Sequence, residues 1–402
     1  MQVFRGLHHA LLRQAGPSAV TVGNFDGVHH GHQAMLALLK SEAEHRGLVA
    51  TVLSFEPHPR DYFAVRAGTP EQAPARIATL RDKLAELARC GVERTVVMPF
   101  DQRFCSQSPQ AFIDDVLVRG LDARYVLVGD DFRFGARRAG DYAMLDAAGE
   151  ASGFDVARMM SYEVHGLRVS SSAVREALAG GDMALAARLL GRPYSISGHV
   201  VHGRKLGRAL GAGAAGDDGF RTLNLRFPHR KAAASGIFVV RVHGLSCDAP
   251  VLGAAEPPPR PADAAGARQA TSPSPTAAPT ATPTPSATAT ATAGMPLEGV
   301  ASLGVRPTVE DGGRVLLEVH CFDWPLGLGP EGGYGKLVRV ELLHKLRDEA
   351  RYDGLAELTA AIAQDECAAR EWLASGVAGG TAGLGHAAEP RQTSRDRILP
   401  GS

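Results

Sequence analysis

The chain has 402 residues with 43 basic and 43 acidic side chains, a length sufficient for two or three domains. Its formal charge of zero excludes a global field that would recruit nucleic acid or an anionic membrane. Five scattered cysteines form no Cys-x-x-Cys pair, which favours a reducing compartment over a disulfide framework. We identify no signal peptide and no run of about 18 apolar residues, and therefore expect a cytoplasmic protein.

Short apolar runs alternate with segments of helical periodicity in the first half of the chain. We expect strands over 18–22, 50–55, 94–98 and 125–128, and helices over 33–45, 76–90 and 109–118. Alternation of this kind predicts a parallel, Rossmann-like α/β domain over residues 1–190 with helices on both faces of its sheet. Ligands of such sheets collect at the carboxyl ends of the strands.

Between the first predicted strand and helix lies Gly-Asn-Phe-Asp-Gly-Val-His-His-Gly-His, residues 23–32. A helix start offers free N–H groups and the positive end of its dipole, and glycines such as Gly23 let a phosphate approach closely. His29 and His32 can face the same anion, and Asn24 adds an uncharged donor. Donors fixed in this way suit a phosphate whose charge grows during transfer. A loop of solvated histidines and a metal site are the alternatives.

Three further polar clusters fall at the ends of predicted elements. Each also fits an ordinary structural role, respectively a strand stop, a turn with a buried aromatic ring, and a helix cap. As candidates for binding an anion or a flat ring they supply His58 between two prolines, Asp131 and Phe132 after the fourth strand, and Ser171, Ser172 and Arg175 at a helix start.

From residue 195 the predicted elements change to short strands separated by Gly-rich turns. We expect strands over 195–202, 221–227, 236–243, 299–303, 314–322 and 335–343 and a helix over 355–373. This pattern predicts a six-stranded antiparallel β-barrel with a terminal helix over residues 191–376. Residues 248–296, almost entirely Ala, Pro and Thr, are predicted to be a disordered insertion, and residues 377–402 a flexible tail.

Two features of this half have functional potential. The first is a loop of glycines and basic residues, with Gly203, Lys205 and Gly207, of the kind that wraps a polyphosphate, although such turns are also common on surfaces. The second is Glu318 among apolar strand residues, where a carboxylate is either solvent-facing or a general base.

The ten-residue signature resembles that of bacterial bifunctional riboflavin kinase/FMN adenylyltransferases (FAD synthetases), within the nucleotidylyltransferase superfamily. The segments around His58, Asp131 and Ser171, the loop starting at Gly198, and Leu-Glu-Val-His at 317–320 are similar to later elements of that family. One block departs: the family's Gly-Phe-Pro-Thr-Ala-Asn is interrupted after Gly211, and Gly-Phe-Arg-Thr-Leu-Asn follows at 219–224. Its Thr222 and Asn224 align with the family's Mg²⁺ and phosphate residues.

The resemblance implies two reactions, phosphorylation of riboflavin to FMN in the barrel and adenylylation of FMN to FAD in the α/β domain. The roles that it implies are these: catalysis by His29, His32 and Glu318; ATP or phosphate binding by Gly23, Asn24, His58, Ser171, Ser172, Arg175, Gly203, Lys205 and Gly207; flavin binding by Asp131 and Phe132; Mg²⁺ binding by Thr222 and Asn224. Riboflavin, FMN and ATP are the expected partners, with no nucleic acid or membrane, and weak self-association is left open. The alternatives are an adenylyltransferase with an impaired kinase domain and a non-catalytic flavin-binding module.

Overall fold

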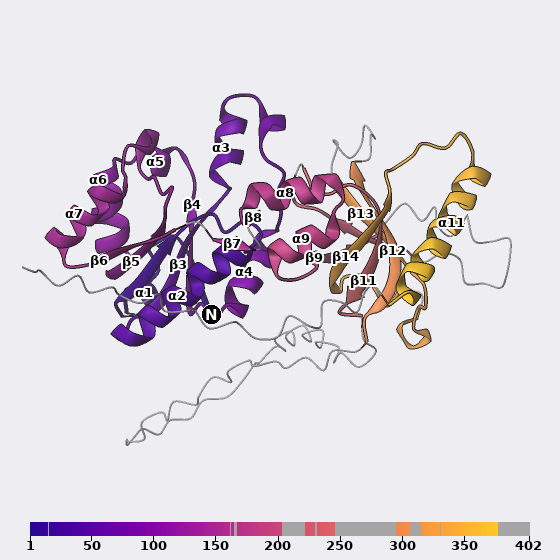
Figure 1. Cartoon of the computed structure of the whole chain (residues 1–402), viewed down its shortest axis with the longest axis horizontal. Helices are drawn as coiled ribbons and strands as arrows, with labels where there is room; N and C mark the ends of the chain where they lie inside the picture. Colours follow the sequence, from indigo (N-terminus) through magenta and orange to yellow (C-terminus); the bar gives the residue numbers. More distant parts are fainter. Residues whose placement is uncertain are drawn as a thin grey trace, which may run out of the picture.

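The computed structural model describes residues 1–14, 16–160, 162–164, 167–202, 222–229, 231–245, 295–305, 315–329 and 331–376. Figure 1 shows an α/β half followed by a barrel. The predicted loop with Gly203, Lys205 and Gly207, nearly all of the predicted insertion and the predicted tail lie outside these ranges.

A six-stranded parallel sheet forms the first half, as predicted. Its strands, in spatial order, are β1 (Gln2–Arg5), β4 (Arg94–Pro99), β3 (Val49–Glu56), β2 (Ser18–Val22), β5 (Ala123–Gly129) and β6 (Asp155–Met159). The sequence predicted the four central strands, because their buried positions produce continuous apolar runs. It missed β1 and β6 because these edge strands are largely exposed and carry no such run.

The helices of this half are α1 (Ala10–Gln14), α2 (His30–Arg46), α3 (Pro59–Arg66), α4 (Leu80–Arg89), α5 (Gln102–Cys105), α6 (Pro109–Ala111), which continues as a π-helix over Phe112–Val118, and α7 (Tyr142–Ser152). Of these, α2 and α7 contact strands of the sheet, whereas α3 projects beyond it (Figure 1). The helix predicted over 76–90 begins only at Leu80. Thr79 caps it by accepting a hydrogen bond from Asp82 N at 3.1 Å. Arg76 is instead extended and forms a β-bridge with Ala232 of the barrel.

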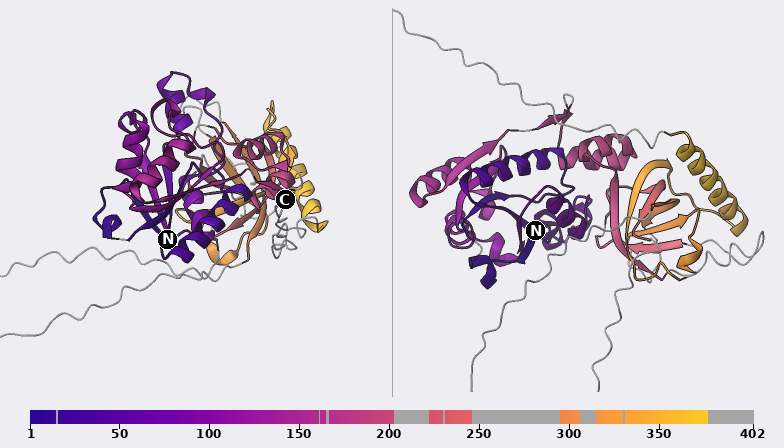
Figure 2. Two further views of the ribbon diagram at one scale, coloured as in Figure 1. Left: turned by 60° about the vertical axis from the view of Figure 1, so that its left-hand side comes forward. Right: turned by 90° about the horizontal axis from the view of Figure 1, so that it is seen from below.

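The second half is a closed antiparallel barrel, which confirms the predicted fold class. Its spatial order is β10 (Thr222–Arg226), β13 (Val315–Cys321), β12 (Leu297–Val305), β11 (Gly236–His243), β14 (Leu337–Arg347) and β9 (Tyr194–Val201). Alternate residues of β13 are buried, as a barrel strand requires. The terminal helix α11 (Leu355–Ala374) packs outside the barrel through Ala369 and Trp372 (Figure 2).

Helices α8 (Ser171–Gly180) and α9 (Met183–Leu190) lie between the sheet and the barrel (Figures 1 and 2). Their buried residues, including Val174 and Leu189, share one hydrophobic cluster with Val200 and Phe238 of the barrel. The division that we place at residue 190 therefore follows the chain and does not mark a break in packing. None of the described helices is long and apolar enough to cross a membrane.

Candidate active sites

The turn that joins β2 to α2 has an unusual backbone. Phe25 (φ 48°), Gly27 (φ 88°) and Val28 (φ 41°) all lie in the left-handed region, which is strongly disfavoured for a β-branched residue. A Cβ at Gly27 would also lie 2.8 Å from Cγ2 of Ile77. Backbone strain of this kind persists only where the surroundings fix it, and it collects at functional sites.

Other elements hold this turn by its carbonyl groups. Three donors each take one oxygen of the turn: Lys83 Nζ donates to Asn24 O at 3.2 Å, Ser171 Oγ to Asp26 O at 3.0 Å, and Arg192 Nη2 to Gly27 O at 2.7 Å. The next oxygen, that of Val28, accepts from Gln33 Nε2 at 2.9 Å. The turn is thereby fixed before a ligand binds, which is the preorganisation that electrostatic catalysis requires.

His29 and His32 meet at the N-terminus of α2, as predicted. Their ring centroids are 3.7 Å apart and nearly parallel. Nδ1 of His29 accepts from His32 N at 3.4 Å, which assigns the proton of the neutral His29 ring to Nε2. A Cβ at Gly31 would lie 3.3 Å from this Nδ1 and 3.5 Å from Val169 O. Glycine therefore leaves room for the two rings beside the segment that precedes α8.

Both imidazoles are neutral at pH 7. Burial lowers the pKa of His29 from 6.5 to about 4, against the opposing influence of Asp26. Burial, together with His29 and Lys83, lowers the pKa of His32 well below 6.5. Each ring can therefore donate one N–H to a phosphate without carrying a positive charge of its own.

We expect stability to fall on acidification from pH 6.5 toward about pH 4. Because the pKa of His29 is lowered to about 4 in the folded chain, the unfolded chain binds the proton first, which favours unfolding; below about pH 4 both states are protonated and His29 adds no further loss. Urea unfolding at about pH 7 and about pH 5 should show a smaller pH difference for His29→Asn than for wild type, by on the order of 1–2 kcal/mol. An unchanged difference would contradict this assignment.

Beneath the turn, Asp26 is the centre of a buried charge cluster. Its carboxylate accepts from Arg175 Nη2 at 2.6 Å and from the backbone N–H groups of Ile77 and Ala78, while Arg76 Nε lies 3.7 Å away. Asp26 and Arg76 are each 2% exposed. Burial by itself raises the pKa of Asp26, but Arg76 and Arg175 outweigh it and lower the pKa below 3.8. The carboxylate therefore stays ionised inside the protein.

The three residues predicted at the start of α8 have different surroundings. Ser171 and Arg175 both bond to Asp26, and Arg175 Nε also donates to Ala75 O at 2.6 Å. Ser172 is exposed. The geometry makes Ser171 and Arg175 clamps on the signature turn. Contact of Ser171, Ser172 and Arg175 with the ATP triphosphate stays a prediction.

Lys83 is a site residue that the sequence reasoning missed. It is 1% exposed, and its Nζ also donates to Ser54 Oγ at 3.1 Å. Burial, together with Arg76, lowers the pKa of Lys83 to about 8. A signal was present in the sequence, because Lys83 lies four residues before the buried Leu87 and thus on the apolar face of α4.

His58 joins the same region from the end of β3. Its Nδ1 caps α3 by accepting from Arg60 N at 3.1 Å. Burial, together with Arg76, lowers the pKa of His58 to about 3, so the ring is neutral. The structure thus brings His58 to the charge cluster under the signature turn, and its predicted contact with ATP stays a prediction.

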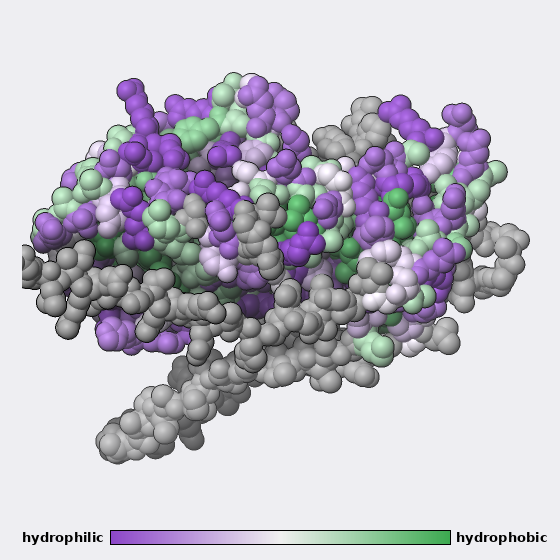
Figure 3. Space-filling model, viewed as in Figure 1, coloured by the Kyte–Doolittle hydropathy of each residue, from purple (hydrophilic) through white to green (hydrophobic). Residues whose placement is uncertain are grey.

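Aromatic rings form a row along the carboxyl ends of β3, β4 and β5. Neighbouring centroids are 5.4–6.2 Å apart in the series Phe55–Phe104, Phe104–Phe112, Phe112–Phe134 and Phe134–Phe132. Phe63 of α3, half exposed, extends the row through Phe100; Figure 3 shows hydrophobic surface at α3. Of the predicted flavin residues, Phe132 ends this row and Asp131 beside it is exposed.

In the barrel, Asn224 and Glu318 lie opposite each other on β10 and β13, and Ser302 of β12 lies on the other side of Glu318. Residues in such register have Cβ atoms about 4.5–5.5 Å apart. Thr222, two residues along, lies opposite His320. The predicted base and the predicted metal residues are therefore neighbours. Ser302 Oγ donates to Glu349 Oε1 at 2.7 Å, which adds a second carboxylate that the sequence did not reveal.

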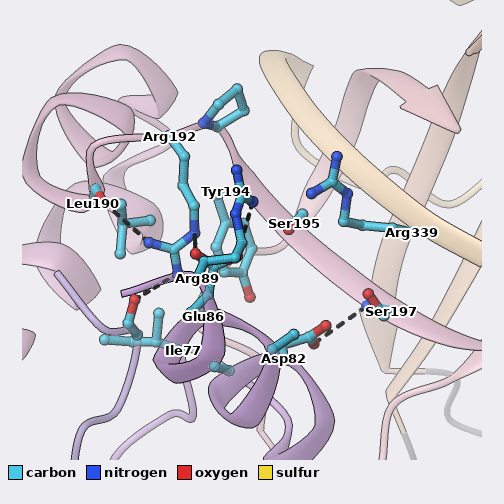
Figure 4. Close-up of a pocket in the computed structure, with 14 residues that line it drawn as sticks. Ile77, Asp82, Glu86, Arg89, Leu190, Arg192, Tyr194, Ser195, Ser197 and Arg339 are labelled. Atoms are coloured by element: carbon cyan, nitrogen blue, oxygen red, sulfur yellow. Dashed lines mark hydrogen bonds and ion pairs between the residues drawn. The ribbon is translucent and has the colours of Figure 1, made fainter. Parts of the chain in front are cut away.

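A pocket of about 90 Å³ lies where the two halves meet (Figure 4). It is lined by α4, the start of β9 and Arg339 of β14. Ser197 N donates to Asp82 Oδ2 at 3.3 Å across this junction, and Arg192 pairs with Glu86 at 3.2 Å. Because Arg192 also holds the signature turn, the segment that connects the two halves is bonded directly to the first site.

Two family models match this chain in succession. Residues 12–173 match FAD synthetase and residues 190–373 match riboflavin kinase. The α/β site and the barrel site therefore define a two-domain class of flavin-nucleotide transferase. The chain belongs to the family of bifunctional riboflavin kinase/FMN adenylyltransferases, which confirms the resemblance seen in the signature.

Curated relatives with that name extend over most of the chain. The protein from Escherichia coli K12 is 38% identical over 93% of this chain and 98% of its own length. Those from Pseudomonas fluorescens and Haemophilus influenzae are 38% and 36% identical and cover 92% and 91% of this chain, and 97% of their own lengths. A solved Streptococcus pneumoniae chain, titled a macrolide-efflux protein, has a TM-score of 0.62 at 23% identity and covers 92% of this chain and 99% of its own. It shares the fold.

Proposed function

We propose that this chain makes FAD from riboflavin in two ATP-dependent steps. The barrel transfers a phosphoryl group from ATP to riboflavin, giving FMN and ADP. The α/β domain transfers AMP from a second ATP to FMN, giving FAD and pyrophosphate. The observation that carries this proposal is that one chain of this family combines an intact signature turn with a register-matched Asn224 and Glu318.

In the adenylyl transfer, a phosphate oxygen of FMN attacks the α-phosphorus of ATP and the bond to the β-phosphate oxygen breaks. We assign the growing charge to neutral N–H donors of His29 and His32, with Asn24 and the backbone at Gly23 beside them. Positioning and fixed dipoles are sufficient for such a transfer without a covalent nucleophile. His58, Ser171, Ser172 and Arg175 bind ATP or hold the turn that does.

We place the flavin ring of FMN along the aromatic row. Phe132 at its end and the half-exposed Phe63 offer apolar faces to a flat ring. Asp131, exposed beside Phe132, accepts a hydrogen bond from a ring N–H or a hydroxyl. This arrangement lies at the carboxyl ends of the strands, where ligands of parallel sheets bind.

In the kinase step, Glu318 takes the proton of the ribityl 5′-hydroxyl while its oxygen attacks the γ-phosphorus of ATP, and ADP leaves. The oxygen donors of Thr222 and Asn224 are hard ligands of the kind that Mg²⁺ prefers, and these two residues would hold the ion together with phosphate and water. When bound, Mg²⁺ neutralises charge on the transferred phosphate. Gly203, Lys205 and Gly207, outside the described ranges, are proposed to wrap the polyphosphate.

The partners are these small molecules, and we propose neither nucleic acid nor membrane binding. The four cysteines within the described ranges are free thiols, which supports our placement of the protein in the reducing cytoplasm. Weak self-association remains a prediction.

Purified protein given riboflavin, ATP and Mg²⁺ should yield both FMN and FAD by chromatography. FAD from supplied FMN, with no FMN from riboflavin, would mean that the interrupted Thr222–Asn224 block has lost kinase activity. No product from either substrate would point to a flavin-binding module. The preserved register of Asn224 opposite Glu318 favours the first outcome.

A further inference from the structure

We propose that the barrel supplies a working part of the adenylyltransferase site, and that His229, which follows β10, is a positioning residue for adenylyl transfer. The inference rests on the proposed function of the α/β site. It concerns residues 227–229 and 231–232, which lie in the riboflavin kinase half of the chain.

Backbone contacts join residues 231–232 of the barrel half to the α/β half. Arg76 N donates to Lys231 O at 3.2 Å, and Arg76 forms a parallel bridge with Ala232. Lys231 Nζ donates to Glu71 O at 3.3 Å. The barrel therefore holds the extended segment that precedes α4.

That extended segment supports the signature turn. The N–H groups of Ile77 and Ala78 bind the carboxylate of Asp26, and Arg76 pairs with Asp26 and, at 3.0 Å, with Asp61. Asp26 is part of the strained turn that leads to the histidine pair. A shift of the segment on the barrel side therefore moves the turn that faces the nucleotide.

At His229, the contact between the barrel and the α/β half includes buried nitrogen atoms that have no hydrogen-bond partner among the described residues. These atoms are Nε2 of His229 and Nε and Nη2 of Arg76. Arg76, Asp26 and Lys83 are the charged groups that act on the His229 ring, and the ring packs edge-on against Phe227. Buried polar groups are rarely left unpaired. We infer that His229 accepts a hydrogen bond from Arg76, directly or through one water, when the nucleotide site is loaded.

The charges around position 229 favour a histidine as the acceptor for Arg76. Burial, together with Arg76, lowers the pKa of His229 to about 4, so the ring is neutral beside two cations. A lysine or arginine would add a third positive charge, and an apolar residue would leave Arg76 without an acceptor. A neutral imidazole nitrogen supplies the acceptor at no electrostatic cost.

The test uses the full chain and measures its two reactions separately. We expect His229→Ala to lower kcat for FAD formation from FMN by about tenfold to a hundredfold, because a small misplacement of reacting groups has such effects. KM for FMN and the rate of FMN formation from riboflavin should stay unchanged. His229→Gln, which keeps a side-chain acceptor, should recover most of the lost rate.

Arg226→Ala, an exposed change at the end of β10, is the matched control and should alter neither reaction. If the wild type forms FAD and His229→Ala forms it at the same rate, this inference alone is overturned. If the wild type forms no FAD, the proposed function is overturned. Equal loss of both reactions with a lower unfolding midpoint, without recovery in His229→Gln, would assign His229 to stability and also overturn it.

Discussion

Substitution of His32 by alanine should lower FAD formation from FMN by about a hundredfold to a thousandfold, the usual cost of removing one fixed donor to developing charge. The ring stacks on His29 at 3.7 Å and is neutral, so its loss removes a directed N–H and not a bulk charge. The rate of FAD formation at saturating FMN and ATP measures the effect. Phosphorylation of riboflavin should be unaffected because the barrel site uses none of these atoms.

His29 needs a different substitution, because its side chain also caps α2. His29→Asn keeps a capping acceptor, removes the imidazole donor and should reduce the same rate to a similar extent. His30→Ala is the matched control: His30 lies between the two histidines in sequence and packs near Gly191. It should change the rate by less than about threefold. An equal fall in His30→Ala and His32→Ala would show that the turn, and not the donor pair, is being measured.

The second large effect belongs to the barrel. Glu318→Gln keeps the size of the side chain but removes its ability to take a proton, so FMN formation from riboflavin should fall by about a hundredfold to ten-thousandfold. FAD formation from supplied FMN should continue at the wild-type rate. Measuring each product with its own substrate separates the two reactions.

Glu298→Gln provides the control for charge on the barrel. Glu298 lies on the neighbouring strand β12 and forms a partly exposed pair with Arg241 at 3.4 Å, which is worth little. We expect both reactions to survive this change. If Glu318→Gln lowered both reactions equally, the division of labour between barrel and sheet would be wrong.

Local periodicity in the sequence was sufficient to predict most of the fold. The alternation of buried strands and helices predicted the parallel sheet, and the short strands after residue 195 predicted the closed barrel. The errors have local causes. Exposed edge strands leave no apolar run, and the start of α4 was misplaced because Arg76 pairs with the barrel and not with its own helix.

By itself, the sequence determined what depends on near neighbours: the histidine pair three residues apart at a helix start, the glycines of the turn before it, and Glu318 within its strand. Only the tertiary structure decided what closes over them. Lys83 and Arg76 come from α4 and the segment just before it, His229 comes from the barrel, and the aromatic row comes from still other segments. The physical reason is that the role of a buried charge or an unpaired ring nitrogen depends on the groups packed against it. Packing between distant segments produces no periodic pattern in the sequence.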